Sequence, residues 1–233
     1  MSYIELEKVN KKYVMGKQTI NAAKDVNFEI EKGELVVILG PSGAGKTTLL
    51  NLLGGMDYVS SGKIIVDGED IAKYNSKELI KYRRYDIGFV FQFYNLVQNL
   101  TAIENVELAS QISKNPLDPK KVLESVGLKD RLNNFPSELS GGEQQRVSIA
   151  RAIAKNPKML LCDEPTGALD SKTGSLILEL LEKVCREDKM TVIIITHNSG
   201  IADIADKVIK MKNGQIEKII KNKNPISAKG IKW

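Results

Sequence analysis

A glycine-rich loop between an apolar run and a helix-forming segment constrains this chain more than any other feature. Residues 35–39 are apolar, residues 48–53 favour a helix, and the linking residues follow the pattern G-x-x-x-x-G-K-[ST]. They are Gly40, Pro41, Ser42, Gly43, Ala44, Gly45, Lys46 and Thr47. Glycines let backbone N–H groups face a polyphosphate, while the helix N-terminus and Lys46 add positive charge.

The sequence therefore predicts a strand, a loop that binds nucleotide phosphates and a helix, with the hydroxyl of Thr47 available to Mg²⁺. The alternative is a glycine-rich turn that merely joins a strand to a helix. That alternative does not explain why Lys46 and Thr47 follow the last glycine at this offset.

Length and composition indicate one soluble globular domain. The 233 residues suffice for a full core, and 42% of them are hydrophobic. The apolar runs are too short to span a bilayer, and residues 1–7 lack the pattern of a secretory signal. We therefore expect a cytoplasmic protein.

Two cysteines and one histidine argue against a zinc site or a disulfide framework. The net charge of +5 is compatible with nucleic acid or anionic lipid as a partner. Much of the excess comes from the lysines at 218, 221, 223, 229 and 232, without aromatic residues between them. We therefore expect a solvated, poorly ordered basic tail over 223–233 near a membrane surface, and no nucleic-acid partner.

Two kinds of strand are expected. Alternating polar and apolar residues predict half-buried antiparallel strands at 4–7, 26–30 and 63–68. Continuous apolar runs are typical of parallel strands covered on both faces, and they occur at 35–39, 159–162 and 192–195. The dipeptide Asn213-Gly214 predicts a hairpin between 207–212 and 215–220, at which the sheet ends.

Between residues 99 and 134 the pattern changes to short helical pieces. Thr101 and Glu104 have the spacing of a capping box, and Asp118-Pro119 predicts another helix start. A longer helix is expected from about Gly142 to the residues before Pro157. We interpret 95–155 as a helical insertion into an α/β core within a domain that covers 1–222.

Two carboxylates follow the apolar run 159–162. Ligands of parallel sheets bind beyond the carboxyl ends of the strands, which is where Asp163 and Glu164 are expected to lie. There Asp163 would hold Mg²⁺ through water, and Glu164 would accept a proton from the attacking water. The alternative is two acidic residues that begin a surface turn before Pro165.

A second helix start has features of an anion site. Ser140 and Glu143 are spaced as a capping box, which by itself predicts a capped helix. That reading leaves Gly141 and Gly142 unexplained, because glycine costs helix stability. Exposed backbone N–H groups, a hydroxyl and a helix N-terminus together predict a second phosphate-binding element.

Together these motifs resemble the ATP-binding cassette of ABC transporters, from near Tyr3 to about Ile220. The motifs that carry the resemblance are, in order, Walker A (40–47), the Q-loop glutamine Gln92, the signature (139–144), Walker B (159–164), the D-loop (168–170) and the switch histidine His197. Residues 89–96, 163–170 and 196–198 are most similar to macrolide exporters, lipoprotein-releasing systems and bacitracin-type peptide-antibiotic resistance transporters.

The resemblance implies an α/β fold: a P-loop NTPase core with a mixed parallel sheet, an N-terminal antiparallel β subdomain and an inserted α-helical subdomain. It also implies a dimer of two cassettes around two ATP molecules, each Walker A facing the partner's signature. Ser140, Gly141 and Gly142 would then contact the γ-phosphate held by the second copy.

The resemblance assigns the remaining site residues in the same way. Lys46 would hold the β- and γ-phosphates, Thr48 the α-phosphate and His197 the γ-phosphate. Thr47 and Gln92 would contact Mg²⁺, and Asp170 joins the nucleotide-binding set through the D-loop. Tyr13 would stack on adenine, although its spacing alone favours a core or strand-edge tyrosine.

The chain departs from many family members at Glu143, where they carry glutamine. A glutamate suits the third helical position and the helix dipole, but it adds negative charge near a triphosphate. The departure concerns the nucleotide geometry at this residue.

The expected partners are a second copy of the chain and an integral membrane permease. The apolar residues that follow Gln92, namely Phe93, Tyr94, Leu96 and Val97, and the helical insertion are predicted to receive the permease. The alternative is that these side chains only pack between the two lobes.

Two other functions are alternatives to transport. One is a regulatory ABC ATPase that signals through a membrane partner without carrying cargo, which the sequence cannot separate from transport. The other is an ABC ATPase that acts on DNA or ribosomes. The second is disfavoured because only 93 residues, 47–139, separate Lys46 from Ser140, and because cysteines are few.

Overall fold

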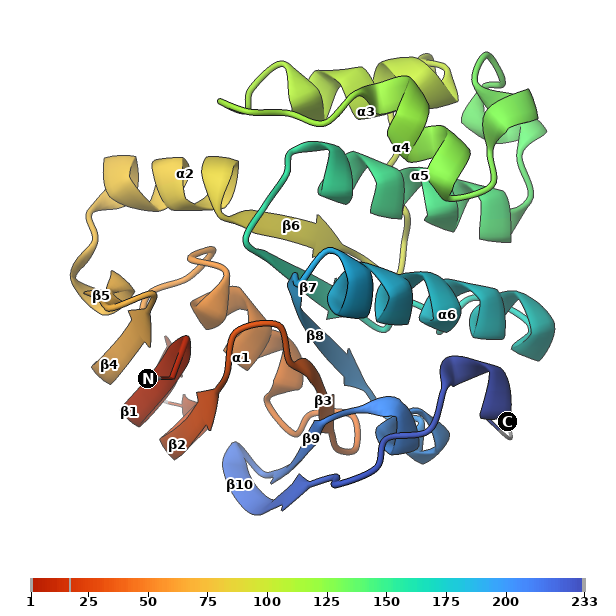
Figure 1. Cartoon of the computed structure of the whole chain (residues 1–233). Coiled ribbons are helices and arrows are strands. Elements are labelled where there is room, and N and C mark those ends of the chain that lie inside the picture. Colours follow the sequence, from red (N-terminus) through yellow and green to blue (C-terminus); the bar gives the residue numbers. More distant parts are fainter. Residues whose placement is uncertain (1, 17, 232–233) are drawn as a thin grey trace.

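The computed structural model describes residues 2–16 and 18–231 (Figure 1). Its strands are β1 (Ile4–Met15), β2 (Gln18–Ile30), β3 (Leu35–Leu39), β4 (Ser61–Val66), β5 (Glu69–Asp70), β6 (Ile87–Val90), β7 (Met159–Asp163), β8 (Thr191–Thr196), β9 (Lys207–Lys212) and β10 (Gln215–Lys221). Its helices are α1 (Lys46–Leu53), α2 (Ser76–Tyr85), α3 (Ala102–Ser110), α4 (Pro119–Ser125), α5 (Gly141–Ala154) and α6 (Ser171–Glu187). Among the described residues, no helix combines the length and apolarity needed to cross a bilayer.

The central sheet has the strand order β10-β9-β3-β8-β7-β6. Strand β3 is parallel to β8 and β9, and β7 is parallel to β6 and β8. The hairpin β9–β10 is antiparallel and forms one edge of the sheet, as Asn213-Gly214 predicts. The expected mixed, mainly parallel sheet in an α/β core is confirmed.

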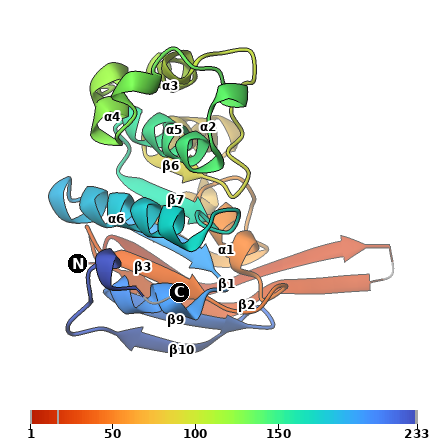
Figure 2. The same ribbon diagram turned by 90° about the vertical axis from the view of Figure 1, so that its right-hand side faces the viewer.

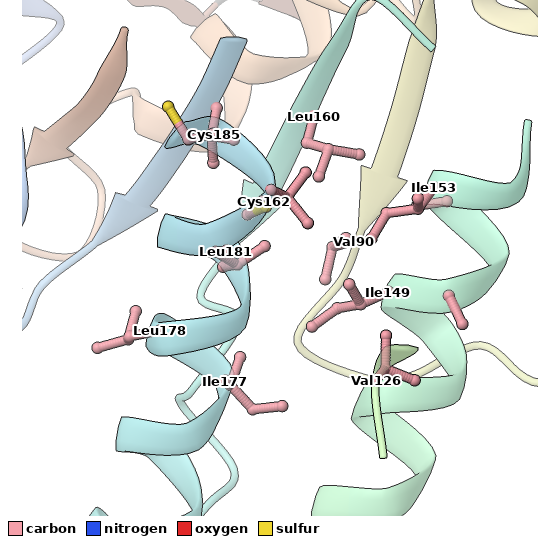
Figure 3. Packing of buried hydrophobic residues seen from close by; sticks show 14 of the residues in the cluster. Val90, Val126, Ile149, Ile153, Leu160, Cys162, Ile177, Leu178, Leu181 and Cys185 are labelled. Carbon is pink, nitrogen blue, oxygen red and sulfur yellow. The ribbon is translucent and has the colours of Figure 1, made fainter. Parts of the chain in front are cut away.

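The alternating side chains of the buried strands separate two cores. Leu35 and Val37 face a cluster that includes residues of α5 and α6, whereas Val36 and Ile38 face α1 and the N-terminal strands. Figure 3 shows part of the first cluster, in which Leu160 and Cys162 of β7 lie between side chains of α5 and side chains of α6. Full burial of each such aliphatic side chain contributes about 1.5–3 kcal/mol, which explains the uninterrupted apolar runs.

The N-terminal strands form a second, antiparallel sheet with the order β2-β1-β4-β5. The expected strands at 4–7 and 26–30 lie in β1 and β2, and the strand expected at 63–68 lies in β4 up to Val66, after which residues 67–68 form a turn. Strands β1 and β2 are longer than predicted, and they extend beyond the rest of the chain as a two-stranded arm (Figure 2). The exposed side chains of Val14 and Ile20 lie on this arm.

Helices α3, α4 and α5 form a layer above α6 (Figure 1). Thr101 and Glu104 make the expected capping box of α3, and Asp118 caps α4 with Pro119 in its first turn. The buried Asn105 donates to the carbonyls of Val97, Leu100 and Thr101 and so fixes the approach to α3. The helical insertion predicted from the sequence is therefore present.

The C-terminal residues differ from the expectation. Residues 224–231 lie against α6 rather than as a disordered extension: Ala228 is buried, and its N–H donates to Glu182 Oε2 at 2.9 Å. The prediction of poor order is wrong for this segment, because the buried Ala228 packs it against α6. The last two residues of the predicted tail, 232–233, lie outside the described residues.

Candidate active site

An open cleft of about 1050 Å³ lies at the carboxyl ends of β3, β7 and β8. The sequence-predicted residues that line it are Tyr13, Pro41, Ser42, Gly43, Ala44, Gly45, Lys46, Thr47, Thr48, Gln92, Asp163, Glu164 and His197. Sequence reasoning missed further lining residues on β2 and at the β9–β10 turn: Ile20, Asn21, Ala22, Lys24 and Asn213. The β2 residues carry no sequence motif, and the turn motif at Asn213 predicts a hairpin but not its position beside the cleft, which depends on the packing of distant strands.

The phosphate-binding loop is held open by its glycines. Gly43 and Gly45 have φ angles of 77° and 94°, in the left-handed region that favours glycine. A Cβ atom on Gly45 would lie 2.2 Å from the carbonyl oxygen of Ala22, so no larger residue fits there. Helix α1 begins directly afterwards, and no side chain caps its N-terminus. Its first backbone N–H groups are therefore left for a ligand.

Lys46 follows this loop as the first residue of α1, and only 7% of its surface is exposed. Its Nζ donates to the carbonyl of Gly40 at 2.8 Å and to that of Pro41 at 3.1 Å. Both acceptors are neutral, and among the ion pairs of residues 2–16 and 18–231 none includes Lys46. Its charge is thus available to an anionic ligand, which is the property that a nucleotide phosphate requires.

Oxygen donors from three elements meet beside the loop. Thr47 Oγ1 lies 3.4 Å from Asp163 Oδ2 at the end of β7, and Gln92 lines the same cleft. Burial, followed by the charge of Glu164, raises the pKa of Asp163. A hydroxyl, an amide and a carboxylate are oxygen donors that Mg²⁺ accepts, so these residues fit the cation predicted from the sequence.

Glu164 is held in a specific orientation by β8. Its backbone N–H donates to Ile195 O at 3.0 Å, Thr196 Oγ1 donates to Oε2 at 3.0 Å, and His197 Nδ1 lies 2.9 Å from Oε1. Its φ of 46° is uncommon for a residue other than glycine and costs about 1–3 kcal/mol. Such strain persists where the surroundings fix it, and here it turns the carboxylate into the cleft.

Tyr13 lies on the arm at the mouth of the cleft. Its hydroxyl donates to Asp57 Oδ2 at 2.7 Å, and Ile20 is its partner on β2. Burial and the hydrogen bond to Asp57 raise the pKa of Tyr13. A half-buried ring beside the phosphate loop, with Ile20 on the same face of the hairpin, forms an apolar surface that suits a planar base.

Ser140, Gly141, Gly142 and Asp170 do not line this cleft. Ser140 is the N-cap of α5, and Asp170 is the N-cap of α6, where it accepts from Thr173 N at 3.0 Å. A Cβ atom on Gly142 would lie 2.2 Å from Thr173 Cγ2, which fixes how closely the two helix starts pack. The structure therefore separates the two phosphate-binding elements that the sequence predicts.

Helix α5 is also hydrogen-bonded to the segment that follows Gln92. Arg151 donates to the carbonyls of Tyr94 at 2.9 Å and Asn95 at 2.6 Å. The fully buried Gln145 donates to Pro165 O at 2.9 Å, directly after Glu164. Sequence reasoning missed these contacts, because no local pattern marks a side chain that binds a distant backbone carbonyl.

The apolar residues after Gln92 divide between surface and core. Phe93 is 74% exposed and Val97 is 41% exposed, whereas Leu96 is buried. A groove of about 350 Å³ lies beside Phe93 and Tyr94. The expectation that these side chains only pack between lobes is therefore wrong for Phe93, and the expectation of an exposed apolar site does not hold for Leu96.

Comparisons with known proteins agree with this geometry. A family model described as ABC transporter matches residues 23–167. An uncharacterised ABC transporter ATP-binding protein of Thermotoga maritima is 45% identical over 221 residues, which cover 93% of this chain and 94% of that protein. The lipoprotein-releasing system ATP-binding protein LolD 2 of Chlorobium chlorochromatii is 43% identical, over 92% of this chain and 93% of that protein.

A putative ABC transporter ATP-binding protein of Mycoplasma pneumoniae is 43% identical over 99% of this chain, but the chain spans only 50% of that relative's length. Among solved structures, the cassette MJ0796 of Methanocaldococcus jannaschii, a dimer in a post-hydrolysis state bound to ADP and Pi, superposes with a TM-score of 0.86. The two chains are 42% identical, and the match covers 95% of this chain and 99% of that one.

Proposed function

The chain belongs to the ABC transporter family and is an ATPase of the ABC type, and from that premise we propose that it is the ATP-hydrolysing subunit of a transporter. Two copies close around two ATP molecules and drive a separate integral membrane permease. We propose an export or antibiotic-peptide resistance system and a location on the inner face of the cell membrane. The similarity to a lipoprotein-releasing ATP-binding protein supports the export type. Residues 1–222 form the cassette in this proposal, and 223–233 a basic tail.

The observation that carries the proposal is the separation of the two phosphate-binding helix starts. Lys46 lies in the cleft, whereas Ser140 lies outside it at the start of α5. A second copy related by two-fold symmetry can bring its own Ser140, Gly141 and Gly142 to the cleft. The dimeric state of the Methanocaldococcus cassette supports such an arrangement here.

Nucleotide binding follows from the residues that line the cleft. Lys46 contacts the β- and γ-phosphates, the N–H groups at the start of α1 surround them, and Thr48 contacts the α-phosphate. Tyr13 stacks on adenine at the mouth. The uncapped start of α1 and the unpaired charge of Lys46 support these assignments.

Hydrolysis uses the carboxyl ends of β7 and β8. Thr47, Gln92 and Asp163 are the residues that would hold Mg²⁺, and Mg²⁺ when bound neutralises charge on the phosphate oxygens. Glu164 accepts a proton from the attacking water. Thr196 and His197 hold the Glu164 carboxylate in place, and the other ring nitrogen of His197 remains for the γ-phosphate.

The permease is expected to bind beside the helical insertion. Phe93 is the most exposed of the aromatic and aliphatic side chains that follow Gln92, and it borders a groove. Exposed apolar groups next to a groove are typical of protein interaction sites. The hydrogen bonds from Arg151 connect this segment to α5, which begins with Ser140.

The proposal is tested by Glu164→Gln. This variant removes the base and keeps the cleft, so turnover falls by about 10²–10⁴ while ATP accumulates in a stable dimer. Phosphate release and sedimentation with ATP measure the two effects. Glu187→Gln, a change at an exposed carboxylate on α6, serves as the matched control and leaves both unchanged. Wild-type turnover in Glu164→Gln would disprove the assignment of the base.

The membrane partner is tested separately. The chain is purified from solubilised membranes, and the proteins that bind it are identified. A permease with a large extracytoplasmic domain is the expected result for the proposed subfamily. A membrane sensor without transport activity would instead favour the regulatory ATPase considered above.

A further inference from the structure

An ionic contact at the start of α5 is not explained by helix capping. Glu143 Oε2 accepts hydrogen bonds from Ser140 N and Ser140 Oγ, both at 2.8 Å. The other carboxylate oxygen, Oε1, accepts from Arg131 Nε at 3.0 Å. Arg131 is the last residue of a 3-10 turn, Lys129–Arg131, in the helical insertion.

Other helices of the chain show that the capping box itself needs no arginine. Helix α2 has a capping box of Asn75 and Glu78, and α3 has one of Thr101 and Glu104. Among the ion pairs within the described ranges, neither Glu78 nor Glu104 has a basic partner, whereas Glu143 pairs with Arg131. Of these three capping boxes, only the one that contains Ser140 has a basic side chain paired with its glutamate among the described residues.

The segment that carries Arg131 is fixed to α3. The N–H of Ile103 donates to Leu132 O, and that of Ala102 donates to Asn134 O, each at 2.9 Å. This pairing holds the backbone beside Arg131 near the start of α5. The guanidinium is thus kept within reach of Glu143 although it is half exposed.

The charge of Glu143 conflicts with the role proposed for this helix start. Hydrogen bonds from Ser140 lower the pKa of Glu143 to about 2, so the carboxylate is ionised at neutral pH. Within a single copy, this negative charge interacts favourably with the dipole of α5. Its carboxylate contacts Ser140, the residue that would meet the partner's γ-phosphate in the proposed dimer, so that like charges would oppose the approach.

We propose that Arg131 is a positioning residue of the signature, which offsets the charge of Glu143 and thereby lets the ATP held by a second copy approach Ser140. The proposal rests on the proposed function, because it requires the dimer that encloses ATP. Arg131 contacts no nucleotide and acts only through Glu143.

The test uses the full chain with Glu164→Gln, in which ATP stabilises the dimer. Adding Arg131→Gln is expected to weaken ATP-dependent dimerisation about tenfold, as for loss of a charge at an interface. ATP affinity of the single chain, measured at concentrations below dimerisation, stays the same. The loss becomes smaller at high salt, because salt screens the exposed carboxylate. A role of Arg131 in packing alone, without its charge, would not produce this salt dependence.

A double-mutant cycle separates charge from packing. In a chain with Glu143→Gln, which retains the side chain's capping ability without the charge, Arg131→Gln is expected to have no further effect. Lys63→Gln, which removes the exposed pair of Lys63 with Glu7, is the matched control and leaves dimerisation unchanged.

Each outcome has a defined meaning. Unchanged dimerisation in Arg131→Gln, or an equal loss in the presence and absence of Glu143→Gln, overturns the inference and leaves the proposed function intact. Failure of the Glu164→Gln parent to dimerise with ATP overturns the proposed function, and the inference with it.

Discussion

The starts of α1 and α5 are both helix N-termini beside glycines, but they differ in whether side chains cap them. Helix α1 follows Gly45, has no side-chain cap among the described residues and begins with Lys46, whose ammonium group donates only to neutral carbonyls there. Helix α5 follows Ser140, whose side chain and that of Glu143 form a complete capping box. Both sequences are rich in glycine, so glycine content does not distinguish them.

The two helix starts differ in how many of their backbone N–H groups are available to a ligand. Each helix start has backbone N–H groups without intrahelical partners. At α1 they remain for a ligand, which in the proposed function is a phosphate. At α5 the chain satisfies some of them itself, so that in the proposed dimer a phosphate would compete with Glu143 for Ser140. We therefore expect α1 to determine binding and α5 to determine association.

The largest expected effect compares Lys46→Ala with Ser140→Ala. Loss of the charged contact weakens ATP binding to the single chain about 10- to 10²-fold, because a hydrogen bond to a charged group contributes about 1.5–3 kcal/mol. Ser140→Ala leaves that affinity unchanged and abolishes the ATP-dependent dimer. Calorimetric titration with ATP and sedimentation measure the two quantities. Equal loss of affinity in both variants would contradict the division between the helices.

A smaller effect is expected from alanine at the glycines that precede or begin the helices. Gly45→Ala destabilises the fold by about 2 kcal/mol or more, because a left-handed residue costs about 1–2 kcal/mol and the Cβ atom would strike Ala22 O. At Gly141 the nearest atom is Tyr94 Oη, 2.8 Å from the Cβ position, at the end of a side chain that can move. Gly141→Ala should stay within about 1 kcal/mol of wild type. Urea unfolding of both variants provides the measurement.

The smallest effect concerns pH. Because the pKa of Glu143 is about 2 in the folded chain against 4.5 otherwise, its stabilisation is present above pH 4.5 and is lost as the pH falls toward 2. The effect is small because the pair with Arg131 is partly exposed. The stability difference between wild type and Glu143→Gln should shrink over this range in urea unfolding. A difference independent of pH would show that the carboxylate charge does not stabilise the helix start.

The sequence predicts best where a local pattern determines the structure. Continuous apolar runs predict the parallel strands, because both faces of these strands are covered. The position of Asp163 and Glu164 at the end of one run predicts that they lie in a cleft, where the structure has them. Capping pairs such as Thr101 with Glu104 act within one turn, so the sequence contains all that is needed.

Helices α2 and α6 were not predicted, although local signals for them exist. Helix α2 has a capping box, and α6 has apolar residues at Ile177, Leu178 and Leu181 with helical spacing. Strands β5 and β6 were not predicted either, because segments of two and four residues are too short to show the periodicity of a strand.

Other features have no local signal. Arg131 and Glu143 are separated by 12 residues, and Gln145 and Pro165 by 20, so their contacts depend on how the elements pack. The length of the β1–β2 arm also depends on pairing between the strands, since exposed residues such as Val14 do not show the burial pattern of a strand.

The hydrogen bonds of α5 have a mechanical consequence. Arg151 joins the helix to the backbone of Tyr94 and Asn95, and Gln145 joins it to Pro165 after Glu164. The segment beside Phe93 therefore cannot shift alone: either these bonds break or the helix moves with it. The surface near Phe93 and the helix start at Ser140 are thus joined through one helix, and Glu164 is connected to the same helix through Pro165, the next residue along the chain.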